Sequence, residues 1–117
     1  MGGEAYEVLK KFWANQDSGD YTLTAHMFSE DAVFDDPIFG TFNGRSEISK
    51  FLEKMNRIVS SINGVFRLEE LAGDKHTAWA QWSFTSDNGY REGVGVYRVK
   101  DGCITYYRDY MNEEDAS

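Results

Sequence analysis

Two carboxylates far apart in the sequence, Asp36 and Asp109, are the residues best suited to chemistry. Asp36 comes directly before Pro37, the only proline of the chain, and proline favours extended backbone in the residue that precedes it. We therefore expect Asp36 at the end of a strand, where apolar neighbours such as Phe34 and Ile38 would partly desolvate it. Desolvation strengthens a carboxylate as a base, so this setting favours general acid–base catalysis. A polar turn without a chemical role is the alternative.

Asp109 is the second candidate, either as an acid or as a group that orients the substrate. It lies in a predicted strand, where the alternation of side chains places it on one face with Tyr107 and Met111. Two carboxylates in one apolar pocket disfavour each other's ionisation, so at least one of them should titrate above a free carboxylic acid. A salt bridge with Arg108 or Arg91 is the alternative.

Two glycines within a predicted strand, Gly93 and Gly95, point to the same region. Glycine inside a strand often marks a bend or a close approach of another group to the backbone. Their face of the sheet is predicted to form a concave, mostly apolar pocket for a small apolar molecule. A filled pocket, with a helix docked tightly on the glycines, is the alternative. The side chains expected on this face are Trp79, Gln81, Tyr97, Tyr107 and Met111, and Trp13 is expected either at the pocket or in the core.

Helical periodicity predicts three helices in the first half of the chain. The first runs from about Glu4 to Gln16, and Asp20 would cap a short second helix that carries Leu23, Met27 and Phe28. The third follows a turn through Gly40 and Asn43, and it ends at Gly64. Its apolar stripe is predicted to face the core and consists of Ile48, Phe51, Leu52, Met55, Ile58, Val59 and Ile62.

After Gly64 the period changes to two, which predicts four strands joined by hairpin turns. Helices followed by an antiparallel meander indicate an α+β fold with the helices on one face of a curved sheet. The whole chain, residues 1–117, is predicted to form one domain. The strands are expected at about Val65 to Ala72, Thr77 to Ser86, Tyr90 to Lys100 and Cys103 to Met111, with Asp87-Asn88-Gly89 as the turn between the second and the third.

The opposite face of the sheet is also apolar, so it needs a cover other than the helices. A second subunit is the simplest cover, and a homodimer through this outer face is predicted. The residues assigned to the dimer interface are Trp82, Phe84, Val94, Val96, Ile104 and Tyr106.

Composition argues against several classes of partner. The net charge of -8 disfavours nucleic acid and anionic membranes as partners. No apolar run reaches the roughly 18 residues of a membrane span. The single cysteine excludes an internal disulfide and suits the cytoplasm. The sequence has no glycine-rich phosphate loop and no Cys/His cluster, so neither a cofactor nor a metal is predicted.

The order of these features resembles the SnoaL-like and ketosteroid-isomerase-like proteins of the nuclear transport factor 2-like superfamily. The matching segments are KKFWANQDSGDYTLTAHMFSEDAVFDDP, GTFNGRSEISKFL and VKDGCITYYRDYMN, and the resemblance extends from Tyr6 to Asn112. It implies a cone, in which a curved antiparallel sheet wraps around three helices and encloses a pocket, often within a homodimer.

The resemblance also implies roles for individual residues. In ketosteroid isomerases the aspartate before this proline is the base, and Asp36 stands there. The two positions of their oxyanion site hold Phe12 and Gly95 here, which are expected at the substrate but have no side-chain donor to offer it. Limonene-epoxide-hydrolase-like enzymes have an essential aspartate in an RDY motif of the last strand, which Asp109 matches. The SnoaL-like cyclases rely on one acidic residue and little else.

Three functions follow as hypotheses. The first is an enzyme without a cofactor that performs acid–base chemistry on a small apolar substrate, such as isomerisation, cyclisation or hydration, with Asp36 as the base. The second is a binding module that holds a small apolar molecule without turnover. The third is a dimerisation or accessory domain with a filled cavity. An open pocket with Asp36 and Asp109 both directed into it would favour the first hypothesis.

Overall fold

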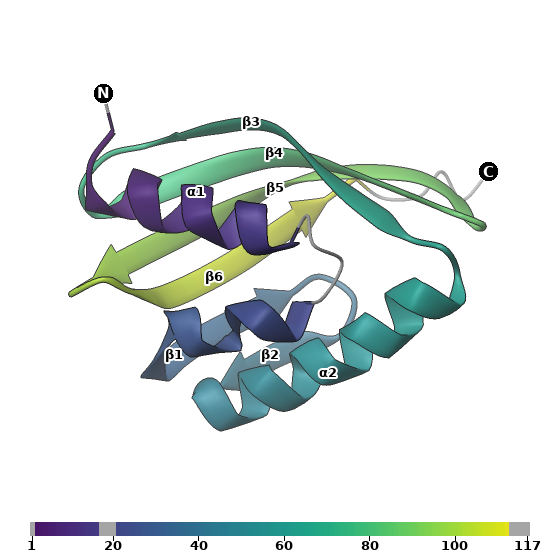
Figure 1. Ribbon diagram of the computed structural model, residues 1–117, viewed down its shortest axis with the longest axis horizontal. Coiled ribbons are helices and arrows are strands. Elements are labelled where there is room, and N and C mark those ends of the chain that lie inside the picture. The colour runs from purple at the N-terminus through teal and green to yellow at the C-terminus, as the bar shows by residue number, and fades with distance from the viewer. Residues whose placement is uncertain (1, 17–20, 113–117) are drawn as a thin grey trace.

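The computed structural model describes residues 2–16 and 21–112, which form two α-helices, one 3-10 helix and a six-stranded sheet. In chain order these elements are α1 (Glu4–Gln16), η1 (Tyr21–Met27), β1 (Phe28–Asp36), β2 (Gly40–Asn43), α2 (Arg45–Ser61), β3 (Val65–Gly73), β4 (Thr77–Ser86), β5 (Gly89–Lys100) and β6 (Cys103–Met111). The strand order is β2-β1-β6-β5-β4-β3, and the sheet curves around both α-helices (Figure 1). The predicted α+β class is confirmed.

Of the three predicted helices, only the first and the third are α-helices. The segment with Leu23 and Met27 forms the 3-10 helix η1, and Phe28 already begins β1. Seven residues that include two β-branched threonines are too few to nucleate a stable α-helix. Asp20, the predicted cap, lies outside the described residues. No helix in the described part of the chain is long and apolar enough to cross a membrane.

α1 is amphipathic and packs its apolar side on the sheet. Its buried residues recur at helical spacing and are Ala5, Leu9, Phe12 and Trp13. The backbone N–H groups of Ala5 and Tyr6 donate to the carbonyls of Lys75 and Asp74, at 3.1 and 3.2 Å. The turn between β3 and β4 therefore satisfies donors that a helix start leaves unpaired, and it fixes this end of α1.

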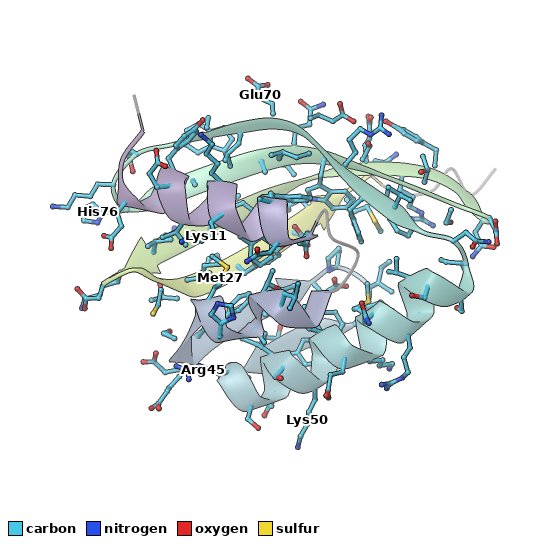
Figure 2. The ribbon with its side chains drawn as sticks, viewed as in Figure 1. Lys11, Met27, Arg45, Lys50, Glu70 and His76 are labelled. Carbon is cyan, nitrogen blue, oxygen red and sulfur yellow. The ribbon has the colours of Figure 1, made fainter. Side chains whose placement is uncertain are left out.

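α2 lies over the β1–β2 end of the sheet (Figure 1). Its buried residues all belong to the predicted stripe and are Ile48, Phe51, Leu52 and Val59. The helix starts after Gly44, whose φ of 89° disfavours a side chain at this position. Charged side chains such as Lys50 of α2 and Glu70 of β3 point away from the interior (Figure 2).

The sheet is mixed, because β1 pairs with β6 in parallel while all other neighbouring strands are antiparallel. The prediction of an antiparallel sheet is therefore wrong at this junction. β1 and β6 lie far apart in the sequence, so no hairpin between them sets their relative direction. The register pairs Phe34 with Tyr107 and Asp35 with Arg108, which brings the end of β1 beside Asp109.

A short strand, β2, occupies the segment predicted as a turn. It pairs with β1 from Val33–Asn43 to Asp36–Gly40, so residues 37–39 form the turn of a hairpin. Glycine and asparagine at its two ends are typical of turns, and this composition conceals the strand from sequence analysis. Asp36 is therefore the last residue of β1, directly before the turn of the β1–β2 hairpin.

The β4–β5 hairpin is one residue tighter than predicted. Ser86 pairs with Gly89, so the turn consists of Asp87 and Asn88 alone. A shift of one residue in the register exchanges the two faces of one strand relative to its neighbour. The inner face of β4 is therefore formed by Ala78, Ala80, Trp82 and Phe84, while Trp79 and Gln81 are exposed on the outer face.

This register corrects two predictions. Trp79 and Gln81 do not face the pocket side of the sheet, so their assignment to the substrate is wrong. Trp82 is buried on the inner face, and Phe84 shares that face, so neither is available to the outer surface. Ile104, also assigned to the dimer interface, is fully buried within this chain.

The homodimer stays a prediction, now with a different set of residues. The outer face carries large side chains with substantial exposed fractions: Trp79 at 49%, Val94 at 40% and Tyr110 at 50%. The variant Val94→Arg, in a central strand, should abolish a dimer because it places a charge in the apolar interface. Light scattering at micromolar concentration should then give the 13.4 kDa of one chain in place of twice that mass.

Val65→Arg is the matched control, since Val65 is exposed on the edge strand β3 and lies away from this patch. It should leave the mass unchanged. A wild-type protein that scatters as a single chain would contradict the dimer.

Candidate functional site

Asp36 is the last residue of β1, and its carboxylate is held by the turn that follows. Its Oδ1 atom accepts hydrogen bonds from the backbone N–H groups of Ile38, at 2.8 Å, and of Phe39, at 2.9 Å. Such a side-chain-to-backbone turn is typical of aspartate and fixes the orientation of the carboxylate. The side chain is half-buried and lines a cavity between α2 and the sheet.

Asp109 projects from β6 into the same cavity. It lies opposite Gly95 of β5, and Gly95 lies opposite Ala80 of β4, so the residues beside the carboxyl group are small. The indole Nε1 of Trp82 donates a hydrogen bond to Asp109 Oδ1 at 3.3 Å. The neighbouring Arg108 faces outward, where its Nε lies 3.7 Å from Asp35 Oδ2. The alternative of a salt bridge between Asp109 and Arg108 is therefore excluded.

The two glycines make room for side chains of the sheet itself. A Cβ atom at Gly93 would lie 2.5 Å from Cζ2 of Trp82, so the indole ring covers this glycine. A Cβ atom at Gly95 would collide with the hydroxyl group of Tyr97. The glycines thus mark a close approach, as expected, but the approaching groups are neither a helix nor a ligand.

A buried aromatic layer lies behind the carboxyl group of Asp109. Trp13 Nε1 donates a hydrogen bond to Tyr97 Oη at 3.3 Å, and the rings of Tyr97 and Tyr107 lie 4.7 Å apart. Burial raises the pKa of both tyrosines well above the usual value, and the negative charge of Asp109 raises each further. Both hydroxyl groups therefore stay protonated and can act only as neutral hydrogen-bonding groups.

The cavity has two neighbouring parts that share some of their lining residues. The larger part has a volume of about 230 Å³ and opens to solvent, and a smaller inner part of about 50 Å³ extends toward α1. Five residues border both parts: Asp36, Met55, Phe66, Trp82 and Asp109. The remaining walls of the larger part are mostly apolar and include Ile38, Phe39, Ile58, Val59, Ile62, Phe84 and Met111.

Asp109 has an altered affinity for protons. Burial raises the pKa of this carboxyl group to about 8, the nearby charge of Asp36 adds to the rise, and the hydrogen bond from Trp82 opposes it. Other residues surround the Asp109 carboxyl group on all sides except the one that faces the cavity. At neutral pH Asp109 is therefore mostly a neutral acid that can donate a proton or a hydrogen bond.

The cavity contains only some of the residues that the sequence assigned to it. Asp36, Asp109 and Met111 line the larger part, and Trp13 and Tyr107 line the inner part. Phe12 and Tyr97 are fully buried in the core, outside both linings, and Gly95 lies beneath Tyr97. The apolar cavity residues of α2 belong to a stripe that was predicted to be core. Trp82, which contacts Asp109 directly, is missed because of the predicted hairpin register.

Residues 9–107 match the family described as the SnoaL-like domain. The chain belongs to this family. None of the curated proteins compared with this SnoaL-like domain matches it. The described residues contain no group of three or more His, Cys, Asp or Glu side chains that could hold a metal ion.

The SnoaL-like domain also has the fold of several solved structures. A protein described as a candidate ketosteroid isomerase from Kribbella flavida aligns with a TM-score of 0.80 and 16% identity, covering 97% of this chain and 82% of that one. An LEH-like epoxide hydrolase from M. tuberculosis aligns with a TM-score of 0.74 and 19% identity, covering 93% and 83%. An NTF2-like protein of unknown function from Cytophaga hutchinsonii aligns with a TM-score of 0.76 and 12% identity, covering 92% and 99%. At such identities the similarity establishes the fold, and the activity has to be argued from the site.

Proposed function

We propose that this SnoaL-like domain is an enzyme that transfers protons on a small apolar substrate without a metal or an organic cofactor. The observation that carries the proposal is the pair Asp36 and Asp109, which border one apolar cavity and differ in their surroundings. Asp109, with its pKa raised to about 8, supplies a proton at neutral pH. Asp36 accepts one, and its Oδ2 atom is the natural acceptor because the turn occupies Oδ1.

The proton balance of such a reaction closes within the site. Asp36 removes a proton from a carbon next to a carbonyl group, while Asp109 donates its proton to the carbonyl oxygen and the electron pair forms an enol. If a carbon–carbon double bond lies next to the carbon that loses the proton, the product is a dienol. Return of the proton from Asp36 to the far carbon of that double bond, and of the enol proton to Asp109, then shifts the double bond and completes an isomerisation. Cyclisation or hydration needs the same pair, one group that removes a proton and one that delivers it.

A binding module without turnover is the alternative, and one observation favours it. Asp36 Oδ1 is committed to two backbone N–H groups of the turn, which is sufficient reason for an aspartate at this position. A small apolar molecule retained through purification and detected by native mass spectrometry, with no chemical change over time, would favour binding alone. The cytoplasmic location and the single domain over residues 1–117 stay predictions, and so does the third hypothesis, a dimerisation or accessory domain.

Hydrogen–deuterium exchange at carbon tests the enzyme hypothesis without knowledge of the natural substrate. Small cyclic ketones incubated with the protein in D₂O should exchange the protons next to the carbonyl faster than in buffer, as followed by NMR. Asp36→Asn and Asp109→Asn should each lower the catalysed rate by about 10²–10⁴-fold, because each removes one partner of the proton transfer.

Asp35→Asn is the matched control. Asp35 precedes Asp36 in the same strand but contacts Arg108 and Thr41 outside the cavity. The Asp35→Asn variant should catalyse the exchange of the ketone protons at the wild-type rate. Equal exchange by the wild type and Asp36→Asn, or no catalysed exchange at all, would contradict catalysis and favour the binding module.

A further inference from the structure

The inner part of the cavity is small and has polar groups in its wall. Its volume of about 50 Å³ compares with about 230 Å³ for the larger part. It is similar to the space of two water molecules in the liquid, roughly 30 Å³ each. The body of a ligand therefore lies in the larger part, and the inner part admits a head group of a few heavy atoms, such as a carbonyl group.

Gln16 brings an amide group to this inner part. It is the last residue of α1, and helical spacing places it on the side of the helix that carries Phe12 and Trp13. Both of these side chains are buried against the sheet, so the Gln16 side chain is directed toward the same interior. It is half-buried and lines the inner part together with Asp109.

Gln16 differs from the other hydrogen-bond donors in this lining. Three of them already have a partner in the chain: Trp13 meets the hydroxyl group of Tyr97, Trp82 meets Asp109, and Tyr107 meets Tyr97. The amide of Gln16 makes no hydrogen bond with any residue in the described ranges 2–16 and 21–112. A half-buried amide without a partner is unfavourable, and a ligand that accepts its hydrogen bond removes this cost. The Gln16 amide and the proton of Asp109 are thus the donors that remain for a ligand.

Asp36 borders both parts of the cavity. A ligand whose carbonyl oxygen lies in the inner part, between Asp109 and Gln16, has the carbon next to the carbonyl group where the two parts meet. That carbon is then beside Asp36, and it is the carbon from which the proposed reaction removes a proton. The same orientation leaves the rest of the ligand among the apolar walls of the larger part.

We propose that the inner part binds the carbonyl oxygen of a small neutral ketone, which accepts one hydrogen bond from Asp109 and a second from the amide of Gln16. A carbonyl oxygen has two lone pairs, so it accepts both bonds at once. Donors that are already in place bind this oxygen more strongly as negative charge develops on it, which lowers the barrier to enol formation. An anionic head group is disfavoured, because Asp36 repels it. This inference rests on the proposed function, and it adds Gln16 as the second donor together with the class and the orientation of the ligand.

Cyclohexanone and methylenecyclohexane probe this site, since they differ only in the oxygen or methylene group on the same ring. Gln16→Met keeps the length of the side chain and removes the donor. It should lower the affinity for the ketone, relative to that for the hydrocarbon, by about three- to tenfold, as measured by NMR titration. The rate of carbon exchange in D₂O at saturating ketone should fall by about 10²-fold, since one preformed donor contributes that much to catalysis.

Infrared spectroscopy of cyclohexanone with ¹³C at the carbonyl reads the two hydrogen bonds without turnover. Bound to the wild type, the carbonyl stretch should lie at a lower frequency than in hexane, and this measurement needs no variant. Gln16→Met should move the band part of the way back to the hexane value. Gln81→Met is the matched control, because Gln81 is the only other glutamine and is exposed on the outer face of β4. It should change neither the band, nor the ratio of affinities, nor the exchange rate.

A carbonyl band at the hexane frequency in the wild type, or no binding of the ketone, would overturn the proposal. So would a Gln16→Met variant with the band and the ratio of affinities of the wild type. Catalysed exchange that Gln16→Met leaves unchanged would contradict this inference and leave the proposed function intact. A shifted band that depends on Gln16, without carbon exchange in D₂O, would instead contradict catalysis and leave this inference intact.

Discussion

Replacement of Phe51 by alanine is expected to lower the free energy of unfolding by about 2–5 kcal/mol. The ring is 4% exposed and contacts three other phenylalanine rings that belong to β1, the turn after it and β2. The ring of Phe42 stacks on it with centroids 4.2 Å apart, and that of Phe34 meets it edge-on at 5.2 Å. Alanine would leave a void between α2 and the β1–β2 hairpin, because these rings cannot all move to fill it.

Urea unfolding followed by circular dichroism measures the loss. Leu52→Ala, at the next position of the same stripe, should fall in the same range, since Leu52 is also 4% exposed. Lys50→Ala, on the exposed side of α2, should change the free energy of unfolding by less than about 0.5 kcal/mol. A loss below about 1 kcal/mol for Phe51→Ala would show that the apolar stripe of α2 does not pack in the core.

The second large effect concerns the dependence of stability on pH. The pKa of Asp109 is about 8 in the folded protein, while an unfolded aspartate has a pKa of about 3.9. Between these values the folded state binds more protons than the unfolded state, so the free energy of unfolding falls as pH rises from about 4 to about 8. The stabilisation that comes from Asp109 is complete below the pKa of the unfolded state. It is lost as the pH rises through the pKa of the folded state.

Asp109→Asn removes this dependence, because an amide does not titrate. At pH 8 the variant should be more stable than the wild type by several kcal/mol, on the order of 1.36 kcal/mol for each pKa unit between the folded and the unfolded state, and at pH 4 the two should be alike. Chemical denaturation across this pH range is the measurement.

Asp36→Asn is the companion variant. It removes the second cause of the raised pKa, so the Asp109 carboxyl should titrate below 8 and the fall in stability should begin at a lower pH. NMR of the Asp109 side-chain carbon follows this shift directly. A wild-type stability that is flat or rises between pH 5 and 8 would contradict a raised pKa for Asp109.

The sequence predicts most elements because their signals are local. The helical period of apolar residues predicts α1 with the bounds that the structure has. The alternation of apolar and polar residues, together with the hairpin turns, predicts β4 and β6 with the same bounds as in the structure. The position of Asp36 at a strand end also follows locally, from Pro37. Each of these features depends on neighbours within a few residues along the chain.

The errors concern pairing, which depends on residues far apart or on a single residue. Counting Gly89 as part of the turn moves the register of β4 by one, which takes Trp82 out of the site and puts Trp79 and Gln81 into it. The parallel junction of β1 with β6 has no local signal at all. The cavity wall of α2 looks like core in sequence because a cavity lined by apolar residues needs the same residue types.

The parallel junction of β1 with β6 has a consequence for the order in which the molecule assembles. During synthesis β1, β2 and α2 emerge before the other four strands, yet the strand that β1 needs as its inner neighbour is the last of the six. Until β6 is made, the nascent chain presents one long unpaired strand edge on β1 and another on β5, and such edges are templates for aggregation. The two carboxylates meet only at the end of this process, so proton affinity at Asp109 is a direct sign of a completed sheet. A chain released before β6 would lack Asp109 and would expose both strand edges, so it would be prone to pair with other chains.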